Sequence, residues 1–162
     1  MLKFAAMPLT DPRLHQTLNS ARALFAELPA PSRLAGVWRA EFVGPAWLPR
    51  LARAAMPLSV LRGWCGKRFD AQGRGENLVK RAGAVRGIVA MREVHQASKL
   101  DGLPVAVASY GAGTPLSLRY VEDELRRLDR DVLLGMMTFR ITGLRRLGLP
   151  FLLHRVPDES AL

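Results

Sequence analysis

The chain of 162 residues fits one domain and is long enough to bury a sizeable core without disulfides or metals. An apolar fraction of 49% with 23% charged residues excludes disorder over most of the length, and the single cysteine excludes an internal disulfide. The formal net charge is +10, and almost all of the excess is arginine. Such a surface can attract nucleic acid, anionic lipid or an acidic partner, but net charge alone reports on solubility and nonspecific association.

The first predicted element is an amphipathic helix over residues 11–28. Asp11 takes the N-cap position and Pro12 the first helical position, and apolar residues recur at spacings of three and four as far as Leu28. Pro29 ends the helix, because proline disfavours helical backbone at its own position and just before it. We expect this helix to lead into the main domain.

A strand over residues 34–43 follows, and a short helix comes after it. Alternate positions of the strand carry Trp38 and Phe42 on one face and polar residues on the other, which is typical of a half-buried antiparallel strand. Residues 46–56 then place apolar side chains at helical spacing with arginines beside them. This pattern predicts a short basic amphipathic helix.

The remainder of the chain reads as short strands separated by turn signals such as Asp101-Gly102. The predicted strands cover residues 63–69, 77–81, 88–100, 103–109, 116–128, 132–142 and 149–156. The strands have no intervening helix long enough for a crossover, so the fold class is mainly β and the architecture a closed or nearly closed antiparallel barrel over residues 34–156. We expect residues 157–162 to form a frayed tail to this single domain.

Several motifs resemble the GxWxG-type domain of bacterial proteins and the companion domain that usually follows it. They are Leu28-Pro29, residues 36–39, the block Trp64-x-Gly-Lys-Arg-Phe with its neighbour Gly63, and residues 104–110, 123–126, 131–137 and 150–153. The resemblance spans residues 25–156, and the tryptophan block is its most specific part. Ala40 stands where the family has its second glycine, and residues 142–149 read as an insertion. The resemblance implies a lipocalin-like barrel and supplies no agreed activity.

Gly36-x-Trp38 also resembles the start of the first strand in lipocalins, where an arginine of the last strand packs over the tryptophan. Arg155 occupies the matching place in this chain. A guanidinium over an indole is a cation–π contact worth about 0.5–2 kcal/mol. We therefore expect Trp38 and Arg155 to touch and to close the bottom of the barrel, in a structural role.

Two residues are candidates for proton transfer. His95 lies within a predicted strand and would suit this chemistry if it faced the barrel lumen, although an exposed or hydrogen-bonded histidine is the commoner case. Asp123 lies in the acidic run 122–124, whose neighbouring side chains face opposite sides of a strand and cannot form a carboxylate dyad. The three histidines of the chain show no metal-ligand spacing, so we predict neither a metal nor a cofactor.

The ligand-binding candidates are large apolar or basic side chains expected along the barrel lumen or at its mouth. They are Trp64, Arg68, Met91, Arg126, Met136 and Phe139. Methionines offer a soft, adaptable lining, and Trp64 with Arg68 would stand at the mouth. Arg126 and Asp123 enter through the resemblance, because the family repeats this acidic-then-arginine stretch.

These features predict binding of a small hydrophobic or amphipathic ligand in the barrel. An isomerase or cyclase using His95 or Asp123 in the same cavity stays open, as does an arginine-rich module that reads acidic partners. A pure binder needs an apolar cavity without a titratable group, an enzyme needs a histidine or carboxylate projecting into the cavity, and an interaction module would have a filled barrel.

The partners and the location follow from the same patterns. Residues 47–61 and 139–156 mix arginine with large apolar residues, which suits peripheral contact with an anionic membrane, unless the apolar side packs on the barrel. Nucleic acid is disfavoured because few aromatic residues are interleaved with the basic ones. The N-terminus lacks the apolar length of a signal peptide and no run approaches the ~20 residues of a bilayer span, so we expect a cytoplasmic protein.

Overall fold

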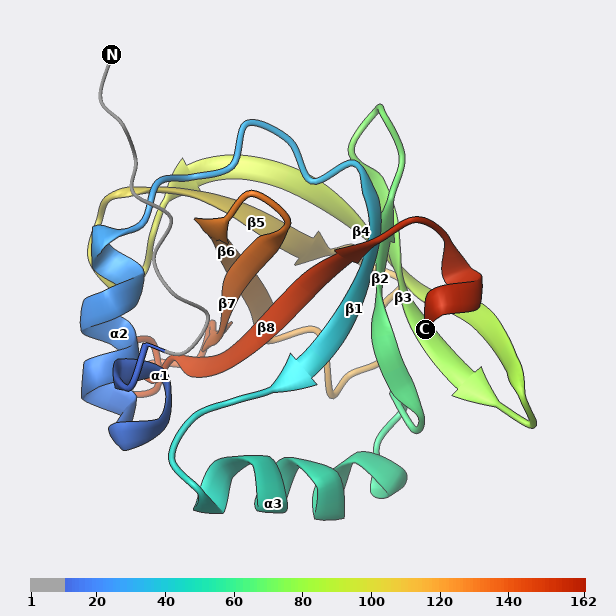
Figure 1. Cartoon of the computed structure of the whole chain (residues 1–162), viewed down its shortest axis with the longest axis horizontal. Coiled ribbons are helices and arrows are strands. Elements are labelled where there is room, and N and C mark those ends of the chain that lie inside the picture. The colour runs from blue at the N-terminus through green and yellow to red at the C-terminus, as the bar shows by residue number, and fades with distance from the viewer. Residues whose placement is uncertain (1–10) are drawn as a thin grey trace.

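Eight strands form a closed antiparallel barrel in the computed structural model, which describes residues 11–162 (Figure 1). Each strand pairs with its neighbours in the sequence, and β1 pairs with β8 to close the ring. The strands are β1 (Gly36–Phe42), β2 (Trp64–Phe69), β3 (Arg74–Arg81), β4 (Ala84–Ala97), β5 (Pro104–Tyr110), β6 (Val121–Asp129), β7 (Val132–Phe139) and β8 (Leu149–Val156). The predicted fold class is thereby confirmed.

The predicted leading helix is divided at Thr17 into α1 (Arg13–Gln16) and α2 (Leu18–Glu27). Thr17 has extended backbone, with φ −143° and ψ 164°, and its hydroxyl accepts a hydrogen bond from the Ser20 amide at 3.0 Å. The Ser20 hydroxyl in turn accepts from the Thr17 amide at 3.0 Å, which completes a capping box. The spacing of apolar residues runs through this break, so the pattern alone does not reveal the cap.

The hairpin of β3 and β4 is longer than the two predicted strands within it. The chain reverses at Ala82 and Gly83, which have φ values of 49° and 78°. Gly87, which precedes the predicted strand 88–100, lies inside β4 opposite Leu78. Conversely, β6 begins only at Val121, because residues 111–120 form a connection rather than the start of a strand.

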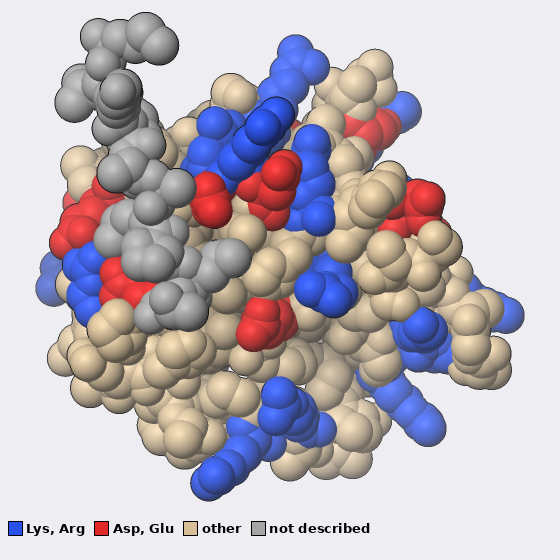
Figure 2. Space-filling view, viewed as in Figure 1, with Lys and Arg blue, Asp and Glu red and all other residues tan. Residues whose placement is uncertain are grey.

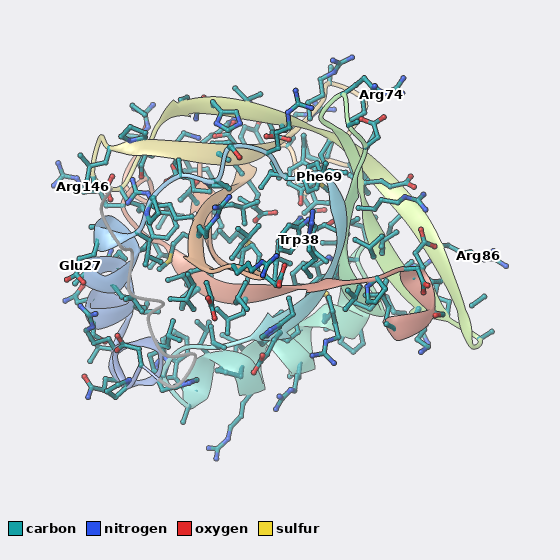
Figure 3. The ribbon with its side chains drawn as sticks, turned by 45° about the horizontal axis from the view of Figure 1, so that its top comes forward. Glu27, Trp38, Phe69, Arg74, Arg86 and Arg146 are labelled. Atoms are coloured by element: carbon teal, nitrogen blue, oxygen red, sulfur yellow. The ribbon has the colours of Figure 1, made fainter. Side chains whose placement is uncertain are left out.

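Two apolar clusters flank the barrel wall. The outer cluster lies between α1 and α2 and the outward faces of β5 to β8, and Phe25, Leu134 and Met136 are among its fully buried members. The inner cluster fills much of the barrel and includes Trp38 and Phe69. In Figure 3 these two side chains point inside the ring of strands, whereas labelled arginines point to solvent.

The predicted contact between Trp38 and Arg155 is present at the end of the barrel where β1 begins. The guanidinium carbon of Arg155 lies 5.1 Å from the centre of the indole ring, and the two residues are direct neighbours in the β1–β8 pairing. The indole N–H donates to the Leu34 carbonyl at 2.7 Å. This end of the barrel is therefore closed by packed side chains.

Helix α3 (Trp47–Ala55) joins β1 to β2 and lies across the opposite end of the barrel, followed by the short helix η1 (Met56–Leu58) (Figure 1). The short helix expected after the first strand is thus present. No helix among the described residues is long and apolar enough to cross a membrane.

The C-terminal residues do not fray as expected. They form the short helix η2 (Glu159–Ala161), and Glu159 makes an ion pair with Arg68 of β2. The Lys80 ammonium also donates to the Leu162 carbonyl at 2.7 Å. Basic side chains along β2 and β3 thus hold the acidic tail against the barrel.

Candidate ligand-binding site

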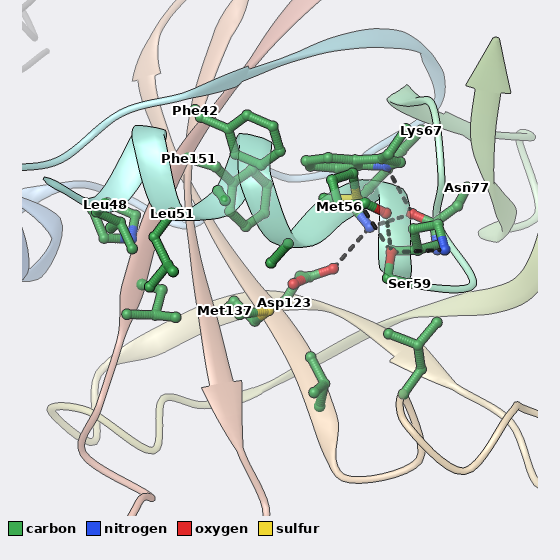
Figure 4. A pocket seen from close by; sticks show the side chains of 18 of the residues that line it. Phe42, Leu48, Leu51, Met56, Ser59, Lys67, Asn77, Asp123, Met137 and Phe151 are labelled. Carbon is green, nitrogen blue, oxygen red and sulfur yellow. Dashed lines mark hydrogen bonds and ion pairs between the residues drawn. The ribbon is translucent and has the colours of Figure 1, made fainter. Parts of the chain in front are cut away.

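A cavity of about 300 Å³ lies between α3 and the interior of the barrel (Figure 4). On the helix side it is lined by Leu48, Leu51 and Met56, which recur at helical spacing. On the barrel side Trp64 forms the centre of an aromatic wall, with its ring centroid 5.6 Å from that of Phe42 and 5.7 Å from that of Phe151. The barrel is therefore hollow beneath α3.

Four polar side chains from four strands meet at the inner wall of this cavity. We call them the polar cluster: Lys67 of β2, Asn77 of β3, Tyr110 of β5 and Asp123 of β6. The Lys67 ammonium lies 2.7 Å from Asp123 Oδ2, 2.8 Å from Asn77 Oδ1 and 3.1 Å from the Tyr110 hydroxyl. The Tyr110 hydroxyl donates to Asp123 Oδ2 at 3.0 Å and accepts from Asn77 Nδ2 at 3.2 Å.

Burial sets the charge states within the polar cluster. Only 1% of the Lys67 side chain and 7% of the Asp123 side chain are exposed. Burial alone would lower the pKa of Lys67, but the charge of Asp123 and the hydrogen bonds around the ammonium outweigh it and raise that pKa above its usual value. Burial, together with the charge of Asp123, raises the pKa of Tyr110 to about 12. Lys67 is therefore a cation and Tyr110 a neutral phenol at neutral pH.

One oxygen of the polar cluster has no partner within the described residues. Both contacts to Asp123 fall on Oδ2, and Oδ1 accepts no hydrogen bond from any residue that the structure describes. No sealed side-chain nitrogen or oxygen among these residues lacks a partner, so Oδ1 must be reachable from the cavity that Asp123 lines. The carboxylate thus offers an acceptor to whatever occupies the cavity, as its place in Figure 4 indicates.

An irregularity in β2 brings Trp64 and Lys67 to the same face. Regular alternation would put residues 64 and 67 on opposite sides of the strand. The pairing with β3 shifts between Trp64 and Gly66, which form a β-bulge around Cys65. Trp64 and Lys67 consequently both line the cavity.

The same bulge corrects the expected pairing of Trp64 with Arg68 at the cavity mouth. Trp64 lines the cavity as predicted. Arg68 instead points outward and pairs with Glu76 and with Glu159 of the tail. Its guanidinium is therefore committed to surface ion pairs and not to a ligand in the barrel.

The predicted apolar lining is only partly placed at the cavity. Met91 and Phe139 belong to the inner cluster, but neither is part of the cavity wall. Met136 faces away from the lumen, into the outer cluster beneath α2, whereas its neighbour Met137 lines the cavity. The alternation along β7 decides this, because successive side chains point to opposite faces.

Arg126 is buried on the outer face of the barrel and serves the fold. Its guanidinium donates to both carboxylate oxygens of Asp101, at 2.6 and 2.8 Å, and to the backbone carbonyl of Phe25 at 2.8 Å. It also donates to the carbonyls of Leu103 and Pro104, each at 3.1 Å. Arg126 therefore ties α2 to the β4–β5 turn and cannot share a site with Asp123.

His95 does not face the lumen, so the condition for its proton-transfer role is not met. Its side chain is 47% exposed and Nε2 lies 2.8 Å from a carboxylate oxygen of Glu93. Asp123 is the candidate that the structure places in the cavity, with Glu122 and Glu124 of the same run buried on the other face of β6. Lys67, Asn77 and Tyr110 were not singled out as site residues by the sequence.

Comparisons with known proteins support the fold. No family model and no curated protein matches the chain. Among solved structures, the chain is similar to a protein from Thermomonospora curvata with a TM-score of 0.63 at 21% identity, covering 88% of this chain and 89% of that one. The barrel is thus shared with a solved structure, whereas the resemblance to GxWxG-type proteins stays a prediction.

Proposed function

We propose that the protein binds a small, mainly apolar molecule in the cavity beneath α3 and holds a hydrogen-bond donor of that molecule on Asp123 Oδ1. The observation that carries this proposal is a cavity of about 300 Å³ with mainly apolar walls, in which one carboxylate oxygen, Asp123 Oδ1, has no hydrogen-bond partner among the described residues. Ligand sites commonly combine apolar walls with a few polar groups that fix orientation. The cavity volume lies at the lower end of their usual range.

The charges of the polar cluster favour a neutral donor, such as an alcohol or an amide N–H. An anionic ligand would meet the Asp123 carboxylate, because the Lys67 ammonium behind it already has three acceptors in contact. A cationic ligand would add a second positive charge to a pair that is already balanced. We therefore expect an uncharged amphipathic molecule rather than a fatty acid.

The first test compares 1-decanol with decanoic acid by native mass spectrometry and by titration of tryptophan fluorescence, to which Trp64 contributes from the cavity wall. We expect the alcohol to bind and the acid to bind about tenfold more weakly or worse, since it brings a charge against Asp123. Asp123→Asn turns an amide N–H toward the cavity and should shift the preference toward ligands that accept hydrogen bonds. Equal binding of both probes to the unaltered protein would contradict the proposed anchor.

A matched pair of variants on α3 tests the place of binding. Ala52 lines the cavity, whereas Ala54 lies on the same helix, is exposed and is not part of the cavity wall. Ala52→Phe should fill the hollow and abolish decanol binding, and Ala54→Phe should leave it unchanged. If both variants bind decanol like the parent protein, the ligand does not lie beneath α3.

A second candidate function is isomerisation by proton transfer, because Asp123 puts a carboxylate inside the cavity, where the cavity expected of a pure binder has no titratable group. With a β,γ-unsaturated ketone such as 3-cyclohexen-1-one, Asp123 would take a proton from the carbon between the carbonyl and the double bond. The double bond shifts into conjugation and the same carboxyl group returns the proton to the γ carbon, so atoms and electrons balance. Ultraviolet absorbance of the conjugated product measures the rate. We expect Asp123→Asn to lower it at least about a hundredfold, and an unchanged rate excludes this role.

A further inference from the structure

One end of the barrel gathers the connections β1–β2, β3–β4, β5–β6 and β7–β8, because consecutive antiparallel strands reverse alternately at the two ends. We call it the α3 end. Its three longer connections are residues 43–63, 111–120 and 140–148. Leu48 and Leu118, from two of these connections, both line the cavity, so the α3 end also surrounds the hollow interior.

The three connections contain no aspartate and no glutamate. They carry seven arginines: Arg50, Arg53, Arg62, Arg119, Arg140, Arg145 and Arg146. Among the described residues only Arg140 of this set makes an ion pair, with Glu122. In Figure 2 the lower part of the molecule, over α3, shows blue side chains among tan ones and no red. Arg146 lies beside α2, whose Arg22 donates to its carbonyl, so the positive surface at the α3 end centres on Arg50 and Arg53 of α3, which make no ion pair among the described residues.

The same connections hold most of the large apolar side chains that the structure exposes. Of nine such residues in the described chain, seven lie here: Trp47, Leu51, Leu58, Leu116, Tyr120, Ile141 and Leu144. Leu58 is 91% exposed, whereas core leucines such as Leu24 and Leu134 are fully buried. Exposed apolar groups gathered on one face mark an interaction surface.

We propose that the α3 end docks on an anionic lipid bilayer. Basic residues interspersed with exposed Trp, Leu and Ile are the composition of segments that lie in the membrane interface, and tryptophan and tyrosine favour the headgroup level. A nucleic acid would use the arginines but would leave these leucines in water. The docked protein places α3, which covers the cavity, against the lipid. The proposal itself does not depend on whether the cavity holds a ligand.

The test is flotation with vesicles of phosphatidylcholine, with and without phosphatidylserine, at physiological ionic strength. Each basic residue near such a surface contributes roughly fivefold to affinity. The double variant Arg50→Glu with Arg53→Glu should therefore bind phosphatidylserine vesicles about 25-fold more weakly or worse. The matched control is Arg92→Glu with Arg130→Glu, which has the same net charge. Arg92 and Arg130 are exposed on β4 and on the β6–β7 turn, away from the α3 end, so we expect affinity within about twofold of the parent.

A second readout separates insertion from loose electrostatic attraction. Brominated phospholipid should quench tryptophan fluorescence on docking, and the quenching should be lost in Trp47→Phe, because Trp38 and Trp64 lie inside the barrel. Equal losses in the two double variants, or flotation without quenching, would overturn the proposal. It would also fail if single-stranded RNA displaced the protein from the vesicles and bound through Arg50 and Arg53 instead.

Discussion

Two buried cations lie on opposite faces of the same barrel wall, and they differ in what their partners leave free. Arg126, beneath α2, donates to two carboxylate oxygens and three backbone carbonyls, and both oxygens of Asp101 are used. Lys67, inside the barrel, directs its contact with Asp123 to one oxygen and leaves the other open to the cavity. The buried charge is common to both places, but only the second offers an acceptor to a ligand.

The comparison teaches that burial of a charged pair does not by itself mark a functional site. A fully satisfied network such as that of Arg126 fixes one element against another. The network of Lys67 and Asp123 leaves one acceptor unpaired, and this acceptor faces an apolar cavity. It can therefore bind the donor of an additional group. Substitutions in the two networks can show whether that of Arg126 serves stability and that of Lys67 serves binding.

The largest loss of stability is expected from a substitution of Arg126. Arg126→Met removes five hydrogen bonds and leaves Asp101 and three carbonyls without their donor, so it should lower the free energy of unfolding by about 3–5 kcal/mol. Urea denaturation measures this loss. Decanol affinity of the folded variant should match that of the parent protein. A change in decanol affinity without a loss of stability would contradict the proposal that Arg126 serves the fold and not the ligand.

A smaller loss of stability is expected from a substitution of Lys67. Lys67→Met leaves Asp123 beside the cavity, where water can partly solvate it, so stability should fall by about 2–4 kcal/mol and decanol affinity should change as well. Lys67→Met combined with Asp123→Leu should recover most of the stability, because no unpaired charge remains. Full thermodynamic additivity of the two single variants would show that the pair is not coupled.

The smallest effect is a loss of stability at alkaline pH, which only the inner network should show. Tyr110, with a pKa of about 12, and Lys67, with a raised pKa, hold their protons more tightly in the folded chain than in the unfolded one. Their contribution is thus complete below about pH 10 and is lost as the pH rises toward 12. For Tyr110 this amounts to roughly 2 kcal/mol. Chemical denaturation between pH 9 and 12 should show a shallower decline in Tyr110→Phe, and an equal slope would rule this origin out.

Much of the barrel could be predicted from the sequence, because turn residues and alternating apolar positions record local backbone preferences. Eight strands and the helix after the first one were placed to within a few residues, apart from the starts of β4 and β6. The division of the leading helix at Thr17 is not predicted, because an N-cap does not disturb the spacing of apolar residues.

The site was less predictable, because its members come from four strands and meet only after the barrel closes. The sequence indicates Asp123 and Trp64 but does not single out Lys67, since nothing in the residue pattern reveals the bulge at Cys65 that brings Lys67 to the same face as Trp64. Asn77 and Tyr110 look like ordinary strand residues until their partners are known. For His95 the sequence leaves a lumen-facing and an exposed position open, and the orientation of β4 makes its side chain exposed and hydrogen-bonded to Glu93.

Helix α3 interrupts neither the hydrogen bonds of the barrel nor its order of strands, because it is inserted between two strands that pair directly with each other. It supplies much of one wall of the cavity and much of the surface of the α3 end. Substitutions in this one segment can therefore change ligand choice and surface preference together while the eight strands keep their register. The pairing of the eight strands thus does not depend on the α3 segment, which makes this segment the natural place to graft a new specificity.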